Sequence, residues 1–432
     1  MSKALPIRNS FFYSSVKYFS FLLLLLSQLG FSQEKESSWK NHYFSSEVLF
    51  GKTAPSNEFF PSLSMQTGLS LGLGKNHLES KSEWAYRLNY PKTGIRLGIN
   101  DMGNRDVLGY QFSLIPYVEL PLFPNKKNPL SMMIGLGSSY FTKKFDEENN
   151  SLNHAVSTNL SWAFDLFFYY PILQSPRTNL RLGLGYSHRS NGHKKLPNNG
   201  YNSFLGSVNA NFKFHKEERS SETVTHPNFK ASQNYYLMLE TGWGENSLAL
   251  SFNEPKNVFA LRLGVGKKIN NTFRIGAGVF YHFYQHYYDY IRNDESLVQG
   301  GEEFESLKKH PTLNASAFGV FISGEMMFLN HVGFALQLGA NLHKPAYGIE
   351  WRHTQGWANT PREIPEGWVL GEYNTKYKLK KLITSKIGAK YYLTSLAKNP
   401  TQNFYISASI NANLGQADFN EFGLGYIYNF KG

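Results

Sequence analysis

Apolar and polar residues alternate one by one along most of this chain, which is typical of β-strands rather than helices. The clearest run extends from Phe404 to Leu414, where the even positions are apolar and most odd positions are Ser or Asn. Because successive side chains of a strand point to opposite faces, each such run has one apolar and one polar face. Comparable runs lie near residues 43–52, 62–74, 84–99, 108–120, 130–141, 154–170, 179–190, 203–214, 235–243, 257–267, 272–286, 311–328, 332–343, 376–393, 403–414 and 421–430.

The connections between these runs alternate in length. Short ones are 269–271, 329–331 and 395–401, and long polar ones are 287–310 and 344–375. Outer-membrane barrels have this parity, with short periplasmic turns and long extracellular loops. It places the 191–202 connection outside the cell and the 171–178 turn in the periplasm. We therefore predict an all-β fold, an antiparallel transmembrane β-barrel of about 16 strands with eight in each half.

A charged segment at 216–233 separates the two halves and lacks alternation. It is either a long turn within one sixteen-strand barrel or a linker between two tandem eight-strand barrels. An eight-strand barrel is filled by its own side chains, whereas sixteen strands enclose a channel. The predicted domains are a first barrel half at 33–215, this segment at 216–233 and a second barrel half at 234–432.

The composition agrees with a transmembrane barrel, in which apolar residues alternate with polar ones and the mean hydropathy is therefore low. The mean hydropathy is −0.39, although Phe and Tyr number 34 and 27 in the 432 residues. Beyond the N-terminus no run of about 20 apolar residues occurs, which excludes a helical membrane protein. A soluble β-sandwich or β-solenoid has a similar composition, and only the strand pattern separates these classes.

The first residues predict export. Lys3, Arg8 and Lys17 precede an apolar segment at 19–26 and the small residues around Ser32, as in a secretory signal peptide spanning 1–32. The absence of Cys excludes disulfides and thiol chemistry. The net charge of +12 suits a phosphate-bearing lipid headgroup, or it belongs to basic loops with no such role. Export and the lack of a recognition motif exclude nucleic acid as a partner.

The hairpin 179–214 carries the candidate chemistry. His188 and Ser190 fall on the same apolar face as the leucines before them, and Asn202 begins the matching face of the next strand. A hydroxyl, an imidazole and an orienting group are what ester hydrolysis by serine requires. Backbone or side-chain donors near Asn191 and Gly192 could stabilise the oxyanion. By spacing alone this pattern is weak evidence for catalysis, because a His and a Ser near a strand end usually form only part of a polar rim.

The segment from His188 to Asn202, with H-x-S-N-G followed by P-N-N-G-Y-N, resembles the active-site segment of the lipid A 3-O-deacylase (PagL) family. The resemblance implies an eight-strand outer-membrane barrel that removes the acyl chain ester-linked at position 3 of lipid A. It implies Ser190 as nucleophile, His188 as general base and Asn191 as an oxyanion contributor, with no cofactor and with lipopolysaccharide as substrate. It also favours two separate barrels slightly over one, and the longer, two-halved relatives are often labelled acyloxyacyl hydrolases.

Two positions depart from the family pattern. The acidic member of the triad falls on Asn202, and a glycine of the oxyanion site falls near His193, next to Gly192. An amide can orient an imidazole but does not stabilise its positive charge. Two alternatives therefore stay open: a non-catalytic barrel, either a porin or a structural protein, and a phospholipase-like esterase. The oligomeric state is not predicted.

Three further polar residues lie on apolar strands. Asp165 falls at an odd position of its run, where we expect a satisfied interior carboxylate, although it could replace the missing acid. His282 and His286 stand among tyrosines, and we interpret them as part of an aromatic girdle at the membrane interface rather than as metal ligands.

Overall fold

The computed structural model describes residues 39–55, 61–123, 129–215, 229–354 and 373–430. Residues Asn41–Gly432 form one compact unit. The predicted signal peptide at 1–32 and most of the predicted connecting segment at 216–233 lie outside the described residues.

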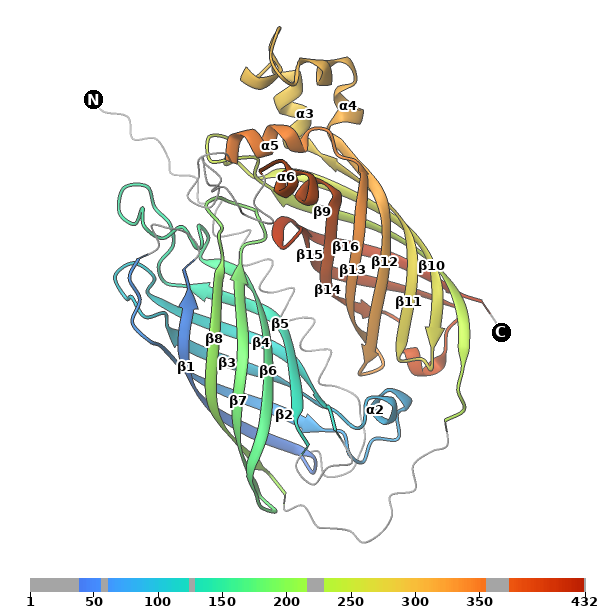
Figure 1. Ribbon diagram of the computed structural model, residues 1–432. Helices are drawn as coiled ribbons and strands as arrows, with labels where there is room; N and C mark the ends of the chain where they lie inside the picture. The colour runs from blue at the N-terminus through green and yellow to red at the C-terminus, as the bar shows by residue number, and fades with distance from the viewer. Residues whose placement is uncertain (1–38, 56–60, 124–128, 216–228, 355–372, 431–432) are drawn as a thin grey trace, which may run out of the picture. The chain divides into compact units, whose positions relative to one another are not determined.

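The first eight strands pair antiparallel with their neighbours in chain order, and β1 returns to pair with β8. They close a barrel (Figure 1). Their bounds are β1 (His42–Ala54), β2 (Gln66–Asn76), β3 (Lys92–Asp101), β4 (Tyr110–Pro121), β5 (Ser131–Phe141), β6 (Leu160–Gln174), β7 (Thr178–Ser190) and β8 (Tyr201–Lys213).

A second barrel follows, closed by the pairing of β16 with β9. Its strands are β9 (Gln233–Asn246), β10 (Lys256–Ile269), β11 (Phe273–Tyr284), β12 (Ser316–Phe328), β13 (Val332–His343), β14 (Ile383–Tyr392), β15 (Gln402–Asn413) and β16 (Gln416–Asn429). The prediction of an all-β antiparallel fold in two eight-strand halves is confirmed. The halves are two closed barrels in tandem, not one large barrel.

Both barrels are apolar outside and polar inside. On β7, Leu182 and Leu184 point outward and are 49% and 69% exposed, whereas Arg181 and Arg189 point inward and are 4% exposed. Inside the first barrel, Arg181 donates to the Glu119 carboxylate at 2.6 Å. An apolar exterior with a satisfied polar interior is the arrangement of a barrel in lipid, and the protein is an outer-membrane protein.

Helices replace the predicted strand pattern at a few places. The run 84–99 begins with the helix α2 (Glu83–Arg87), because Trp84, Ala85 and Leu88 bury one helical face in a small apolar cluster. The strand β3 starts only after Pro91, which cannot donate to a β-ladder.

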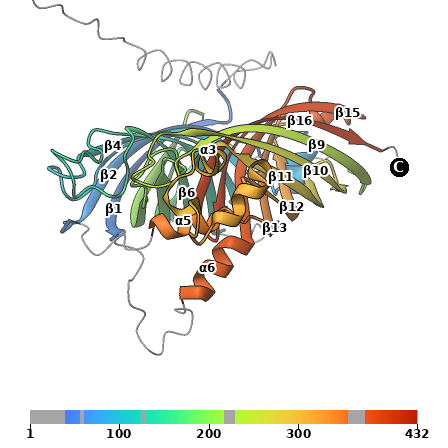
Figure 2. The same cartoon turned by 90° about the horizontal axis from the view of Figure 1, so that it is seen from above.

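The two long connections of the second barrel also carry helices. Between β11 and β12 lie α3 (Gln285–Arg292), η1 (Ser296–Val298), η2 (Glu305–Lys309) and α4 (Pro311–Asn314), and between β13 and β14 lie α5 (Tyr347–Thr354) and α6 (Tyr373–Leu382). These helices gather at one end of the second barrel in Figure 1, and Figure 2 looks onto that end from above. Among the residues described, no helix is long and apolar enough to cross a bilayer.

Candidate functional site

The candidate residues lie at the end of β7 and the start of β8. In the ladder between these strands His188 is directly opposite Asn202, and Ser190 is the last residue of β7. Their even numbers place them on the face that carries the exposed Leu184 and Phe204. The structure therefore brings His188, Ser190 and Asn202 to the outer, lipid-facing side of the barrel, at the rim that carries the 191–200 connection.

Asn202 holds the imidazole of His188 in one orientation. The Asn202 Oδ1 lies 2.8 Å from the His188 Nδ1 and also accepts a hydrogen bond of 2.6 Å from the Tyr186 hydroxyl. Because an amide oxygen only accepts, the proton of the neutral ring must sit on Nδ1. The Nε2 lone pair is then available to take a proton, as a general base requires.

A glycine in the turn makes this arrangement possible. Gly200 has a φ of +73°, and a Cβ built on it would lie 2.9 Å from the Arg189 carbonyl oxygen and 3.1 Å from the His188 Cε1. Any other residue here would have a strained backbone conformation, and its Cβ would press against the imidazole. The P-N-N-G turn thus lets the chain pass close to the histidine.

Two N–H groups converge on the candidate nucleophile. The Ser190 Oγ accepts hydrogen bonds from the Gly192 backbone N–H at 3.1 Å and from the Asn198 Nδ2 at 2.8 Å, and Ser190 is 3% exposed. A hydroxyl has two lone pairs and one hydrogen, so these bonds leave its hydrogen free to be donated. Among the hydrogen bonds between described residues, none joins His188 to Ser190.

Asn191, a residue predicted to stabilise the oxyanion, directs its donors elsewhere. Its Nδ2 donates to the Ser157 Oγ at 3.1 Å and to the Lys195 carbonyl at 2.7 Å, and its backbone N–H donates to the Asn198 Oδ1 at 2.9 Å. Asn191 therefore shapes the loop, while Asn198 and Gly192 supply the donors near Ser190. Asn198 lies in the P-N-N-G motif that resembles the family's active-site segment, but no role for it was predicted. Its place in that motif was the sign in the sequence that it belongs to the site.

His193 stands where the family resemblance leads us to expect a glycine. It has a φ of +69°, is 3% exposed, and burial lowers the pKa of its imidazole to about 4. The ring is therefore neutral at physiological pH and adds no charge to the loop.

Asp165 does not replace the missing acid. It lies inside the barrel, 1% exposed, where its carboxylate accepts hydrogen bonds from the Ser187 hydroxyl and from Arg189, both at 2.7 Å, and pairs with Arg96. His188 is on the opposite face of β7, so the strand itself separates the two groups. Asp165 is the satisfied interior carboxylate that its odd position favours.

The interpretation of His282 and His286 as interfacial aromatics is wrong. His282 lies inside the second barrel, 3% exposed, with its Nε2 3.0 Å from an Arg262 nitrogen, and His286 is 5% exposed on α3. Period-two patterning does not distinguish an interior histidine from an interfacial one when tyrosines occupy both faces. No group of three or more His, Asp or Glu residues able to hold a metal ion occurs in the described part of the chain.

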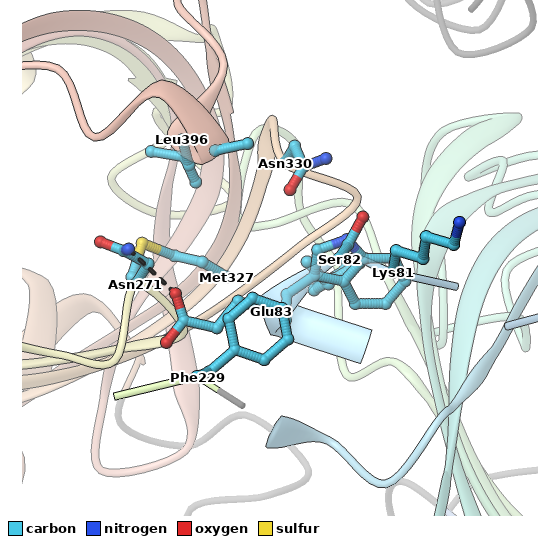
Figure 3. Close-up of a pocket in the computed structure, with 11 residues that line it drawn as sticks. Lys81, Ser82, Glu83, Phe229, Asn271, Met327, Asn330 and Leu396 are labelled. Atoms are coloured by element: carbon cyan, nitrogen blue, oxygen red, sulfur yellow. Dashed lines mark hydrogen bonds between the residues drawn. The ribbon is translucent and has the colours of Figure 1, made fainter. Parts of the chain in front are cut away.

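A cavity of about 250 Å³ lies elsewhere, at the strand ends away from the 191–200 connection. It is lined by α2 and by turns of the second barrel, and Figure 3 shows Glu83 hydrogen-bonded to Asn271 within it. Although Ser82 lines this cavity, no histidine does. It does not offer the groups that ester hydrolysis by serine needs.

The family comparison covers the first barrel. The model of the lipid A 3-O-deacylase (PagL) family matches residues 70–211, from β2 to β8, a span that contains His188, Ser190 and Asn202. The first barrel is PagL-like. The second barrel lies outside the match, so the PagL-like part is about a third of the chain.

Solved structures similar to this chain are outer-membrane barrels. The outer membrane enzyme PagL is 14% identical, over 38% of this chain and 97% of that one, with a TM-score of 0.27. The Acinetobacter baumannii outer membrane protein Omp33 is 10% identical, over 91% and 100% of the two chains, with a TM-score of 0.14. No curated protein matches the chain.

Proposed function

We propose that the PagL-like barrel is an outer-membrane serine esterase that removes the acyl chain ester-linked at position 3 of lipid A. One observation carries the proposal. His188 and Ser190 share the lipid-facing side of β7, and the Asn202 amide leaves the His188 Nε2 free to accept a proton. A lipid substrate lying in the membrane reaches this face directly, whereas a soluble substrate does not.

In the proposed reaction the His188 Nε2 takes the proton of Ser190 as the Oγ attacks the ester carbonyl. The carbonyl oxygen becomes an oxyanion. We expect the Gly192 N–H and the Asn198 amide, which donate to the adjacent Ser190 Oγ, to stabilise it. The tetrahedral intermediate then collapses: the C–O bond to the sugar breaks, and His188 returns the proton to the departing sugar oxygen. Water, activated by the same histidine, hydrolyses the acyl-serine and releases the fatty acid.

The test is mass spectrometry of lipid A from cells that produce the wild-type protein or Ser190→Ala. We expect loss of one 3-linked acyl chain with the wild type and intact lipid A with the variant. Ser187→Ala is the matched control, because Ser187 makes the same chemical change three residues away but faces Asp165 inside the barrel. Heat-modifiable migration in gels shows that each variant forms its barrel.

The same experiment decides between the alternatives. Loss of acyl chains from glycerophospholipid, with lipid A intact, would favour a phospholipase-like esterase. Unchanged lipids with a folded wild-type barrel would favour a non-catalytic barrel.

Replacing Asn202 tests the orienting amide separately. We expect Asn202→Leu to lower kcat about 10²-fold or more, because the imidazole loses the acceptor that keeps its proton on Nδ1. We expect Asn202→Asp to keep that acceptor and raise kcat, since a carboxylate also stabilises the imidazolium. Kinetics on purified protein with lipid A in micelles measure both. Equal rates for Asn202→Leu and the wild type would rule out the orienting role.

A further inference from the structure

The peptide group between Asn191 and Gly192 links the candidate site to the second barrel. Its N–H end, on Gly192, donates to the Ser190 Oγ at 3.1 Å. Its carbonyl end, on Asn191, accepts a hydrogen bond of 2.9 Å from the Asn420 Nδ2 on β16. Because a peptide group is planar and trans, its C=O and N–H point in opposite directions. A hydrogen bond that fixes the carbonyl therefore fixes the direction of the N–H toward Ser190.

Asn420 also fits closely against the glycine. Gly192 has a φ of +68°, and a Cβ built on it would lie 1.7 Å from the Asn420 Oδ1. Only a residue without a side chain allows this approach. Asn420 itself is held in the ladder of the second barrel, where β16 pairs with β9 and β15.

The connection between β9 and β10 holds the following residues of the same loop. The Ser247 N–H donates to the His193 carbonyl at 3.0 Å, and the Ser247 hydroxyl donates to the Lys194 carbonyl at 2.7 Å. Asn253 binds Leu196 at two points, with both hydrogen bonds 2.7 Å long. The second barrel thus contacts the backbone of this loop at several points.

We propose that Asn420 is a positioning residue of the first barrel's active site, which holds the Asn191–Gly192 peptide so that the Gly192 N–H faces the developing oxyanion. This inference rests on the proposed esterase function and assigns a role to the second barrel. Glycine-containing peptide groups rotate with little steric cost. Without Asn420 the peptide would also populate the orientation in which its carbonyl faces Ser190, and a carbonyl repels an oxyanion.

The experiment compares Asn420→Ala and Asn420→Asp with the wild type. Asn420→Asp keeps the shape of the side chain but removes the N–H donor. For both we expect kcat to fall about 10-fold or more, up to the 10²–10³-fold that loss of an oxyanion donor itself costs, with KM unchanged. The matched control is Asn271→Ala, which removes a 3.0 Å hydrogen bond between the second barrel and Glu83 of the first, away from Ser190 (Figure 3). We expect this control to keep the wild-type kcat.

Hydrogen exchange by mass spectrometry on the same full-length proteins gives a readout that does not need activity. We expect the 191–200 segment to exchange faster in Asn420→Ala than in the wild type, and at the wild-type rate in Asn271→Ala. If the wild type hydrolyses no ester, the proposed function is wrong. The hydrogen-exchange rates of the 191–200 segment then test by themselves whether Asn420 holds the Asn191–Gly192 peptide. Unchanged exchange in Asn420→Ala overturns the inference, as does an unchanged kcat in an active protein. An equal loss of kcat in Asn271→Ala also overturns it, because the effect would then belong to general contact between the barrels.

Discussion

The variant His188→Gln is expected to lose the proposed deacylase activity by about 10³- to 10⁴-fold, at the upper end of what a general base contributes. Glutamine has nearly the reach of histidine and keeps polar atoms near Asn202. It has no group that takes up a proton near neutral pH, so Ser190 would have to attack as a neutral hydroxyl. The loss is expected in kcat rather than in KM, because the imidazole acts in the proton transfer of the chemical step and does not bind the lipid.

Kinetics of the purified barrel with lipid A in micelles measure this loss. The control is His331→Gln, the same substitution in the turn between β12 and β13 of the second barrel, where the His331 Nδ1 contacts the Tyr392 carbonyl. We expect it to leave kcat unchanged. If His188→Gln retained more than a tenth of the wild-type kcat, His188 would not be the base, whatever Ser190→Ala showed.

Much of this site could be predicted because β-structure has a period of two. Alternation alone assigns His188, Ser190 and Asn202 to the face of the leucines, and the ladder places His188 opposite Asn202 as the hairpin requires. The interior position of Asp165 follows from the same rule. A period of two predicts on which face of a strand a residue lies. For these four residues, the face decides whether the side chain belongs to the candidate site or to the barrel interior.

The remaining features depend on contacts that no local pattern encodes. The helix α2 forms because Trp84, Ala85 and Leu88 find apolar partners distant in the chain, including Met326 and Phe328 of β12. The donor Asn420 lies 229 positions from the carbonyl it binds. Asn420 is the fifth residue of β16, and the alternation of that strand does not show which distant group its side chain contacts.

The largest effect on stability is expected from a substitution in the interior of the second barrel. The Arg262 guanidinium, 2% exposed, donates to the Glu421 carboxylate through two nitrogens at 2.5 and 2.8 Å and pairs with Glu240 at 3.3 Å. Lys386 contacts the same two carboxylates, so two cations balance two anions. Arg262→Met removes one cation and leaves the two glutamates with Lys386 as their cationic partner, beside the hydrogen bonds from Asn411 and Tyr405. An uncompensated buried charge typically costs about 3–5 kcal/mol. We expect the free energy of unfolding to fall by that amount, measured by urea titration of the protein refolded into lipid vesicles.

The matched control is Arg352→Met, the same substitution at a surface pair. Arg352 binds Glu303 at 2.7 Å with both side chains more than 40% exposed, and such pairs contribute only about 0–1 kcal/mol. The double variant Arg262→Met/Glu421→Gln restores the charge balance inside the barrel, and we expect it to recover part of the lost stability although it has fewer hydrogen bonds. Recovery would show that unbalanced charge is the main cost, whereas a further loss would assign the stability to the hydrogen bonds themselves. An unfolding free energy for Arg262→Met equal to that of Arg352→Met would mean that water enters this barrel and screens the network, because only a dry interior makes an unpaired carboxylate expensive.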